Sequence, residues 1–271
     1  MMRLIVCSSM FHGVRLSRYI HKLAKEGASS IEVWADGEHH FNFFDEAEVS
    51  ALSAALHKNG VQACALHAPY GGQYDLSSLD HSHRQRAITA HRRAIEVARA
   101  IGASVVVVHP GGRLHDAGMR EGALRASIDS LARLIEWAEK YNVIIAVENL
   151  TPIAIGDSSS ELIELVASVS SERLKVCLDT GHANISAEGL IQSLHTLAPH
   201  LIIIHWNDND GFEDLHLPPG RGCINWHQFF AELSKLSKPQ YISLEVALPP
   251  NTTLIGILRG VLSLAPRDAE L

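Results

Sequence analysis

The stretch LIIIHWNDNDGFEDLHLPPGRG, residues 201–222, indicates the fold more clearly than any other part of the chain. Its apolar residues 201–204 end abruptly at His205, and Asp214 and His216 follow shortly before a Pro-Pro-Gly-Arg-Gly turn. A β-branched run that stops at an imidazole is typical of a buried strand that delivers a ligand or a catalytic group at its C-terminal end. The same pattern recurs through the rest of the chain.

Short apolar runs alternate with amphipathic segments along the whole sequence. Several of the segments with helical spacing end at a glycine, as at Gly27, Gly60 and Gly102, which is the expected helix stop. The pattern predicts strands at residues 4–7, 31–35, 61–66, 105–108, 143–147, 174–178, 201–204 and 241–244. It predicts helices at residues 14–26, 46–58, 83–101, 122–141, 160–169, 189–197, 226–236 and 252–264.

Eight strand–helix units in 271 residues are typical of an α/β protein with a (β/α)8 barrel, the TIM barrel. We expect this barrel to form a single domain over residues 1–271. An open, doubly wound sheet is the alternative architecture. It is less favoured because polar residues follow six successive strands, whereas an open sheet gathers its ligands at one switch point.

The composition narrows the class of protein. Hydrophobic residues make up 46% of the chain and charged residues 20%, which is enough apolar material for one large core. No apolar run approaches the roughly 18 residues of a membrane span, so we expect a cytoplasmic protein with no membrane partner. The net charge of −7 argues against a generally basic nucleic-acid surface. Four cysteines without a CxxC pair fit reduced thiols.

Polar residues follow directly on six of the predicted strands, and they are His67, His109, Glu148, Asp179, His205 and Glu245. A barrel gathers such residues at one rim, and carboxylates with imidazoles are the ligands of divalent metals such as zinc or manganese. A single histidine in this position is more often a hydrogen-bonded neighbour than a ligand. An acid directly after a buried run is harder to explain without a cation, because an unpaired charge there costs several kcal/mol. We therefore predict a metal site at Glu148, Asp179, His205 and Glu245.

Seven short motifs occur in order along the chain: LHAPY at 66–70, VVVHPGG at 106–112, VEN at 147–149, CLDTGHA at 177–183, HWND at 205–208, DLHLPPGRGCINW at 214–226 and LEV at 244–246. With these motifs the chain resembles the xylose isomerase-like TIM barrels. That superfamily contains sugar isomerases and epimerases, related dehydratases, and the endonuclease IV group of apurinic-site nucleases.

The resemblance implies a metal cofactor. In the isomerase branch, residues that match Glu148, Asp179, His205 and Glu245 hold a single metal ion, often manganese. In the nuclease branch, three zinc ions are held by residues that match these four together with His67, His109, His182, Asp214 and His216. All nine residue types are present here. We favour one Mn²⁺ or Zn²⁺ per chain, and the nine residues allow up to three.

The isomerase hypothesis assigns roles to these residues. The metal would bind two neighbouring oxygens of a hydroxy-ketone or hydroxy-aldehyde, polarise the carbonyl and acidify the adjacent C–H bond. Glu148 and Glu245 would remove and return the proton through an enediolate. The substrate would be a small carbohydrate, and its contacts would come from His182, Arg221, Tyr70 and Trp34.

The nuclease hypothesis is the first alternative, with several zinc ions activating water against a phosphodiester. That branch usually carries Ser-Lys after its His-x-Asn-Asp motif, whereas this chain has Asn209-Asp210. An acid thus replaces a lysine suited to phosphate contact. The chain also departs from some epimerases, in which an arginine near the Pro-Gly turn takes the place of His216. We favour the isomerase or epimerase, and nucleic acid is a partner only under the nuclease alternative.

An inactive barrel that serves as a binding module is the second alternative, because a fold does not determine a function. The complete set of ligand-type residues argues against it, since a decayed site would be expected to lose some of them. Members of the family often form dimers or tetramers, which allows a homo-oligomer here.

Overall fold

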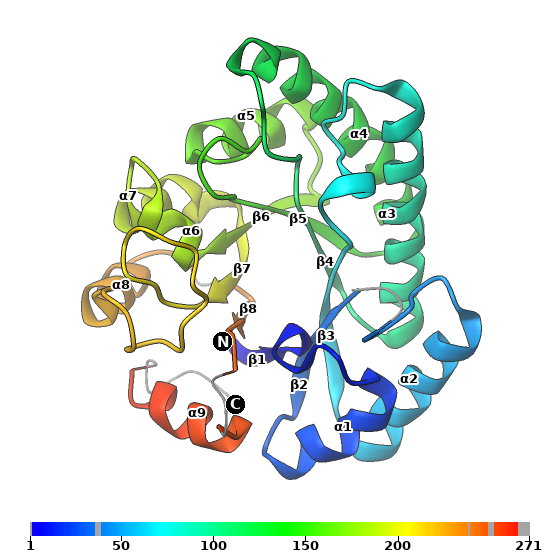
Figure 1. The fold of residues 1–271 in the computed structure, drawn as a ribbon, viewed down its shortest axis with the longest axis vertical. Helices are drawn as coiled ribbons and strands as arrows, with labels where there is room; N and C mark the ends of the chain where they lie inside the picture. Colours follow the sequence, from blue (N-terminus) through cyan, green and yellow to red (C-terminus); the bar gives the residue numbers. More distant parts are fainter. Residues whose placement is uncertain (1, 36–38, 238, 249–251, 265–271) are drawn as a thin grey trace.

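The computed structural model describes residues 2–35, 39–237, 239–248 and 252–264, and within them the chain forms a closed barrel of parallel strands (Figure 1). The strands follow one another around the ring in sequence order from β1 to β8. The last strand pairs with the first, with Leu4 opposite Ile242 and Val6 opposite Leu244. The predicted (β/α)8 fold is therefore confirmed.

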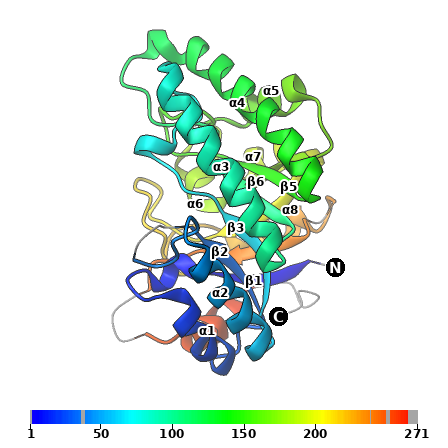
Figure 2. The same ribbon diagram turned by 90° about the vertical axis from the view of Figure 1, so that its right-hand side faces the viewer.

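The strands lie within two residues of their predicted positions. They are β1 (Arg3–Cys7), β2 (Ser30–Trp34), β3 (Gln62–His67), β4 (Val105–Val108), β5 (Ile144–Glu148), β6 (Leu174–Asp179), β7 (Leu201–Trp206) and β8 (Tyr241–Leu244). The main helices are α1 (Leu16–Lys25), α2 (Glu46–Asn59), α3 (His81–Ile101), α4 (Arg120–Tyr141), α5 (Ser159–Val169), α7 (Leu190–Leu197), α8 (Trp226–Leu233) and α9 (Leu254–Leu262). They lie outside the ring of strands, and α3 and α4 pack side by side there (Figure 2).

One short α-helix was not expected from the sequence. It is α6 (Thr180–Ile185), which follows β6 without a loop. Asp179 caps it, because its side chain accepts a hydrogen bond of 2.7 Å from the backbone N–H of His182. An acid at this position satisfies one of the donors that a helix start leaves without a partner. The end of β6 thereby fixes the direction in which His182 leaves the barrel.

The helix ends carry the residues that the sequence indicates. Asp45 and Asp80 accept hydrogen bonds from the first turns of α2 and α3. Gly60 and Gly102 follow these two helices in the left-handed conformation, with φ of 65° and 88°. Glycine adopts this conformation without steric cost, so the predicted helix stops are confirmed. Among the described residues, we find no helix with the length and apolar character that crossing a membrane requires.

Two apolar cores lie on opposite sides of the strands. The larger core fills the space between the strands and the helices, and a smaller core fills the barrel itself. Successive strand residues face opposite sides of a sheet, so Val106 and Val108 of β4 face the helices while Val105 and Val107 face the barrel interior. The barrel is therefore packed, and polar side chains gather at its mouth.

Candidate metal centre

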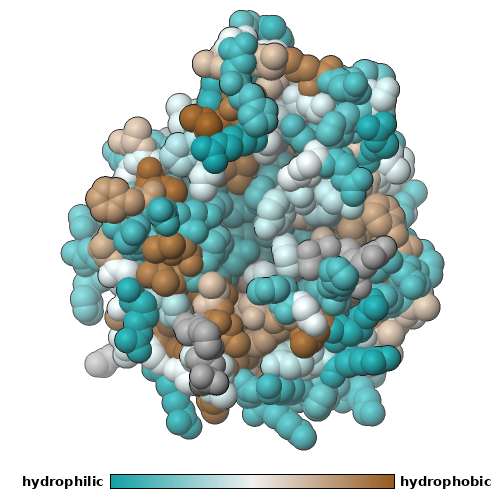
Figure 3. Space-filling view, viewed as in Figure 1, coloured by the Kyte–Doolittle hydropathy of each residue, from teal (hydrophilic) through white to brown (hydrophobic). Residues whose placement is uncertain are grey.

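The carboxyl ends of four neighbouring strands carry acids and an imidazole at the barrel mouth. These four residues are Glu148, Asp179, His205 and Glu245. The residue two positions before each of them has its side chain inside the barrel, and these preceding residues are Ala146, Cys177, Ile203 and Ser243. Alternate residues of a strand share a face, so these four continue the inward-facing rows. The middle of this face is hollowed and hydrophilic in the space-filling view (Figure 3).

Glu148, Asp179, His205 and Glu245 are buried, and one ligand atom from each lies within 4.8 Å of the others. Nδ1 of His205 lies 2.9 Å from Oε1 of Glu148 and 2.9 Å from Oε2 of Glu245. Burial raises the pKa of Glu245, but the charge of His205 outweighs burial and brings this pKa to about 2. Burial lowers the pKa of His205, and the surrounding anionic groups raise it well above 6.5. One imidazole thus lies between two carboxylates.

Glu148 also contacts two histidines from the other side of the mouth. Its Oε2 atom lies 3.2 Å from Nε2 of His67 and 3.2 Å from Nε2 of His109. His67, Glu148 and His205 form a second group with ligand atoms within 4.8 Å of one another. Burial raises the pKa of Glu148, but the charge of His205 and hydrogen bonds from His109 and His205 hold it well below 4.5. Glu148 is therefore shared between two groups of candidate ligands.

A third group of candidate ligands lies farther out and is made of His182, Asp214 and His216. Nε2 of His182 lies 3.1 Å from one oxygen of Asp214, and Nε2 of His216 lies 3.3 Å from the other. Burial lowers the pKa of both histidines, but the neighbouring carboxylates, Asp179 and Asp214 among them, raise it to about 10. Nδ1 of His182 is 3.9 Å from Glu148, so the third group adjoins the first two.

Backbone carbonyls fix the ring orientation of three of these histidines. The carbonyl oxygen that faces Nδ1 belongs to Ala68 for His67 (2.8 Å), to Asn149 for His182 (2.9 Å) and to Glu245 for His216 (3.2 Å). A carbonyl oxygen can only accept, so Nδ1 carries the proton in each case. The Nε2 atoms then point into the groups, which is the orientation that metal-binding histidines need.

The loop after β7 is held in place by Asp208, which is fully buried. Its carboxylate accepts hydrogen bonds from the backbone N–H groups of Gly220 and Ile224 and from the indole N–H of Trp226. The loop folds back so tightly that a Cβ atom on Gly222 would lie 2.1 Å from the carbonyl oxygen of Asn209. This loop carries Asp214 and His216 to the mouth.

A cavity of about 280 Å³ lies over the three groups. Tyr70, His182 and Arg113 are part of its lining, together with Glu148 and Glu245. The ring of Tyr70 stacks on His109, with 4.3 Å between the ring centroids. Two of the four residues predicted to contact a substrate, Tyr70 and His182, therefore line the space above the candidate metal ligands.

The other two lie farther from the cavity. Trp34 stands behind Tyr70, with 6.4 Å between the ring centroids, and is not part of the cavity lining. Arg221 lines a separate cavity of about 570 Å³ between residues 217–221 and α9. The loop geometry after β7, which the sequence pattern does not specify, turns Arg221 toward α9.

Comparisons with known proteins agree with this architecture. A family model for xylose isomerase-like TIM barrels matches residues 20–259. The chain belongs to this family. The resemblance inferred from the seven motifs is therefore confirmed.

Relatives of the xylose isomerase-like barrel include both branches named above. D-psicose 3-epimerase from Agrobacterium fabrum is 23% identical over 237 residues, covering 84% of this chain and 78% of the epimerase. A probable endonuclease 4 from Shouchella clausii is 26% identical over 241 residues, covering 79% of this chain and 81% of that protein. The crystal structure of a D-tagatose 3-epimerase-like protein has a TM-score of 0.83 at 25% identity, covering 97% of this chain and 96% of that one.

The residues of this xylose isomerase-like barrel suit a divalent cation. The central group combines three carboxylates with one imidazole in a buried position, which leaves excess negative charge to be compensated. Burial also raises the pKa of Asp179, as expected for a carboxylate that lacks sufficient positive charge nearby. Oxygen and imidazole nitrogen donors together fit Mn²⁺ or Zn²⁺.

Sequence reasoning missed the residues that support the candidate ligands. Asn207 donates a hydrogen bond of 2.7 Å to Oδ2 of Asp179, and Asn149 bonds the backbone of Asp179 at both its N–H and its carbonyl. Glu32 lies deeper in the barrel and bonds His205. The signal for Glu32 was present, because a lone acid between Ile31 and Val33 must face the side opposite to them.

Proposed function

We propose that this protein is a divalent-metal-dependent isomerase or epimerase of a small sugar or sugar-like hydroxy-carbonyl compound. The observation that carries the proposal is the placement of Glu148 and Glu245. Their carboxylates lie on either side of Nδ1 of His205, each at 2.9 Å, and both residues line the cavity. Two carboxylates at the base of one cavity suit a reaction that removes a proton and returns it.

The two carboxylates have different surroundings. Both oxygens of Glu148 contact imidazoles, since Oε1 faces His205 and Oε2 faces His67 and His109. In Glu245, Oε2 faces His205 while Oε1 lies 3.8 Å from the thiol of Cys7, a weak donor. Oε1 of Glu245 therefore faces only a weak hydrogen-bond donor and is available to accept a proton from a substrate.

A divalent cation held by the central group would polarise the substrate carbonyl and acidify the neighbouring C–H bond. The ionised carboxylate of Glu245 accepts that proton. A second proton, passed to Glu148 from the neighbouring imidazolium of His67, is returned by Glu148 to the same or the adjacent carbon from the other side. His182 and Tyr70 orient the substrate hydroxyls from the cavity wall. Arg221 and Trp34 would contact only a substrate that extends beyond this cavity.

The proposal is tested by proton exchange. The protein is loaded with Mn²⁺ or Zn²⁺ and incubated in deuterated water with free and phosphorylated ketopentoses and ketohexoses, D-psicose and D-fructose included. Phosphorylated sugars belong in the set because Arg113 lines the cavity. We expect deuterium at the carbon beside the carbonyl together with an epimer or isomer, detected by NMR. Absence of exchange with every sugar, in protein shown to hold metal, would contradict the proposal.

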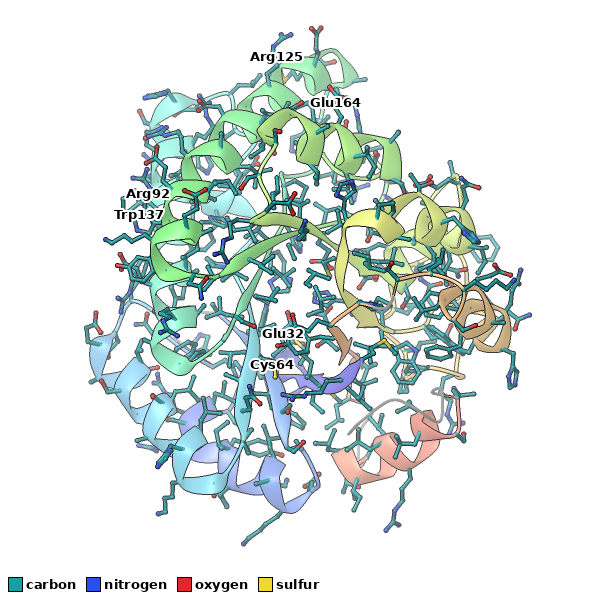
Figure 4. The ribbon with its side chains drawn as sticks, turned by 180° about the vertical axis from the view of Figure 1, so that it is seen from behind. Glu32, Cys64, Arg92, Arg125, Trp137 and Glu164 are labelled. Carbon is teal, nitrogen blue, oxygen red and sulfur yellow. The ribbon has the colours of Figure 1, made fainter. Side chains whose placement is uncertain are left out.

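Variants of the two glutamates sharpen this test. Glu148→Gln and Glu245→Gln should each lower the exchange rate by about 100-fold or more, because each removes a group that both helps to hold the cation and transfers protons. Glu164→Gln is the matched control, since Glu164 is exposed on α5, away from the mouth (Figure 4). Equal exchange rates in the native protein and in all three variants would show that neither Glu148 nor Glu245 takes part in the mechanism.

A second function is favoured by the third group, which gives the mouth more ligands than one cation needs. Several zinc ions there would suit a phosphodiesterase that acts at apurinic sites. The test is cleavage of an abasic-site duplex by zinc-loaded protein. Cleavage that is lost in His216→Asn, together with two or three zinc ions per chain, would favour this nuclease over the isomerase.

A further inference from the structure

Glu32 is an acid buried inside the barrel, below the candidate metal ligands. It lies in the middle of β2, it is fully buried, and its side chain lies near the centre of the ring of strands (Figure 4). The rest of this interior is apolar or weakly polar, with Val105, Val107 and Cys177 among its members. A carboxylate in such surroundings costs several kcal/mol unless its partners compensate for lost hydration.

Two side chains provide that compensation. Oε1 of Glu32 lies 3.2 Å from Nε2 of His205, and Oε2 accepts a hydrogen bond of 2.6 Å from the hydroxyl of Ser243. His205 is also fully buried, and its other nitrogen, Nδ1, faces Glu148 and Glu245. The imidazole therefore connects the carboxylate below it with the two carboxylates at the mouth.

His205 differs from the other histidines at the mouth. His67, His182 and His216 each donate Nδ1–H to a backbone carbonyl and direct Nε2 inward. His205 is reversed, because Nδ1 faces the candidate ligands and Nε2 faces a carboxylate. A carboxylate acceptor holds the proton on Nε2 more firmly than a carbonyl does, and it makes the imidazole a stronger donor toward a metal.

We propose that Glu32 is a positioning residue of the metal centre, which keeps the proton of His205 on Nε2 and aims Nδ1 at the bound cation. The inference rests on the metal centre of the proposed function, but it does not depend on which reaction that centre performs.

The test is metal affinity, measured by competition with a chromophoric chelator. In Glu32→Gln, which keeps the shape and removes the charge, we expect the dissociation constant for Zn²⁺ or Mn²⁺ to rise about 10- to 100-fold, as for other carboxylates behind a metal-bound histidine. Glu164→Gln should bind as the native protein does. Ser243→Ala, which removes one hydrogen bond and leaves the charge, should have a smaller effect than Glu32→Gln.

A variant that lacks the imidazole shows whether Glu32 acts through His205. In His205→Ala protein, the further change Glu32→Gln should leave the remaining metal affinity unchanged, because the imidazole that it positions is gone. An equal loss in both backgrounds would overturn the positioning role, and so would unchanged affinity in Glu32→Gln. Native protein that binds neither metal would instead overturn the metal centre and the proposed function with it.

NMR of the histidine side chains tests the proposal in the native protein, without a substitution of Glu32. With ¹⁵N-labelled histidine, the metal-bound native protein should show His205 with a proton on Nε2 that exchanges slowly with water, and with Nδ1 bound to the metal. His205→Gln identifies the signal by its loss. A proton on Nδ1 with Nε2 bound to the metal would contradict the proposal, whether or not Glu32→Gln folds.

Discussion

At the scale of single residues, Glu148 contacts three imidazoles at the barrel mouth. It accepts from His205 through one oxygen and lies 3.2 Å from both His67 and His109 through the other. Its carboxylate is the shared member of two candidate ligand groups. In the metal-free protein it also provides the negative charge that these buried imidazoles face.

We therefore expect Glu148→Gln to destabilise the metal-free protein. Removing one partner of a buried ion pair leaves the other charge uncompensated, which costs about 3 kcal/mol. The measurement is urea denaturation with a chelator at pH 7, with Glu164→Gln as the surface control. A loss of unfolding free energy as small as that of the control would show that Glu148 does not compensate charged imidazoles in the metal-free protein.

The pH dependence of the metal-free protein follows from the same groups. The pKa values of His182 and His216 rise from 6.5 to about 10, so their stabilising effect is full below pH 6.5 and is lost as pH rises toward 10. The pKa of Glu245 falls from 4.5 to about 2, so its effect is present above pH 4.5 and is lost as pH falls toward 2. The metal-free protein should be most stable between these ranges.

This expectation is measured as the melting temperature between pH 4 and pH 9 in the presence of a chelator. The melting temperature should fall from pH 6 to pH 9. Saturating Zn²⁺ should counteract this fall, because metal binding needs neutral imidazoles and is favoured as pH rises. A melting temperature that increases from pH 6 to pH 9 without metal would contradict the assignment of charged histidines to the mouth.

At the scale of elements, the loop after β7 is the segment whose shape matters most to the mouth. Asp208 anchors it, and it places Asp214 and His216. Gly222→Ala should destabilise the protein by about 2 kcal/mol, because the new Cβ would lie 2.1 Å from backbone of Asn209 and the loop must shift. Thermal denaturation measures this loss.

Gly260→Ala is the matched control for this loop. Gly260 lies in α9, and an added Cβ there would meet no atom within 4 Å apart from its chain neighbours and the helix's own backbone. Alanine at this position should therefore be neutral or should stabilise by up to about 1 kcal/mol. If the third group also holds a metal ion, as the nuclease alternative requires, the loop substitution should reduce the metal content measured by elemental analysis. Equal stability in the two variants would mean that residues 208–226 adapt without cost.

Elements that depend on local patterns could be predicted, and those that depend on the closed barrel could not. Strand β4 is a run of four valines and α2 ends at Gly60, so their positions follow from apolar runs and glycine stops. Helix α6 has only six residues, and its start depends on Asp179, which also has a place in the central group. A pattern of periodicity is too weak over one and a half turns to reveal such a helix.

The candidate site divides in the same way. Residues that follow a strand directly, such as Glu148 and His205, could be placed at the mouth because strand ends of a barrel converge there. The sequence could not show that Arg221 faces α9, because its loop is shaped by contacts of Asp208. Glu32 was not predicted because it lies in the middle of β2, whereas the predicted ligands directly follow the ends of strands.

At the scale of the whole molecule, the candidate ligands connect distant parts of the ring. The second group joins His67 of β3, Glu148 of β5 and His205 of β7, and the central group joins the ends of β5 to β8. A cation in either group would therefore link several strands of the barrel. These strands are joined in sequence by long helical connections. A bound cation would therefore stabilise the closed ring and would bind the unfolded chain far more weakly.

Removal of the metal should consequently lower the melting temperature of the native protein. With free metal at 100 times its dissociation constant, binding contributes about 2.7 kcal/mol. For a chain of this size that corresponds to a shift of roughly 5 to 10 °C. The shift should be much smaller in Glu148→Gln and unchanged in Glu164→Gln, measured by calorimetry with metal and with chelator. Equal melting temperatures in both conditions would mean that the ring closes without a cation, and the acids at the mouth would then need another source of positive charge.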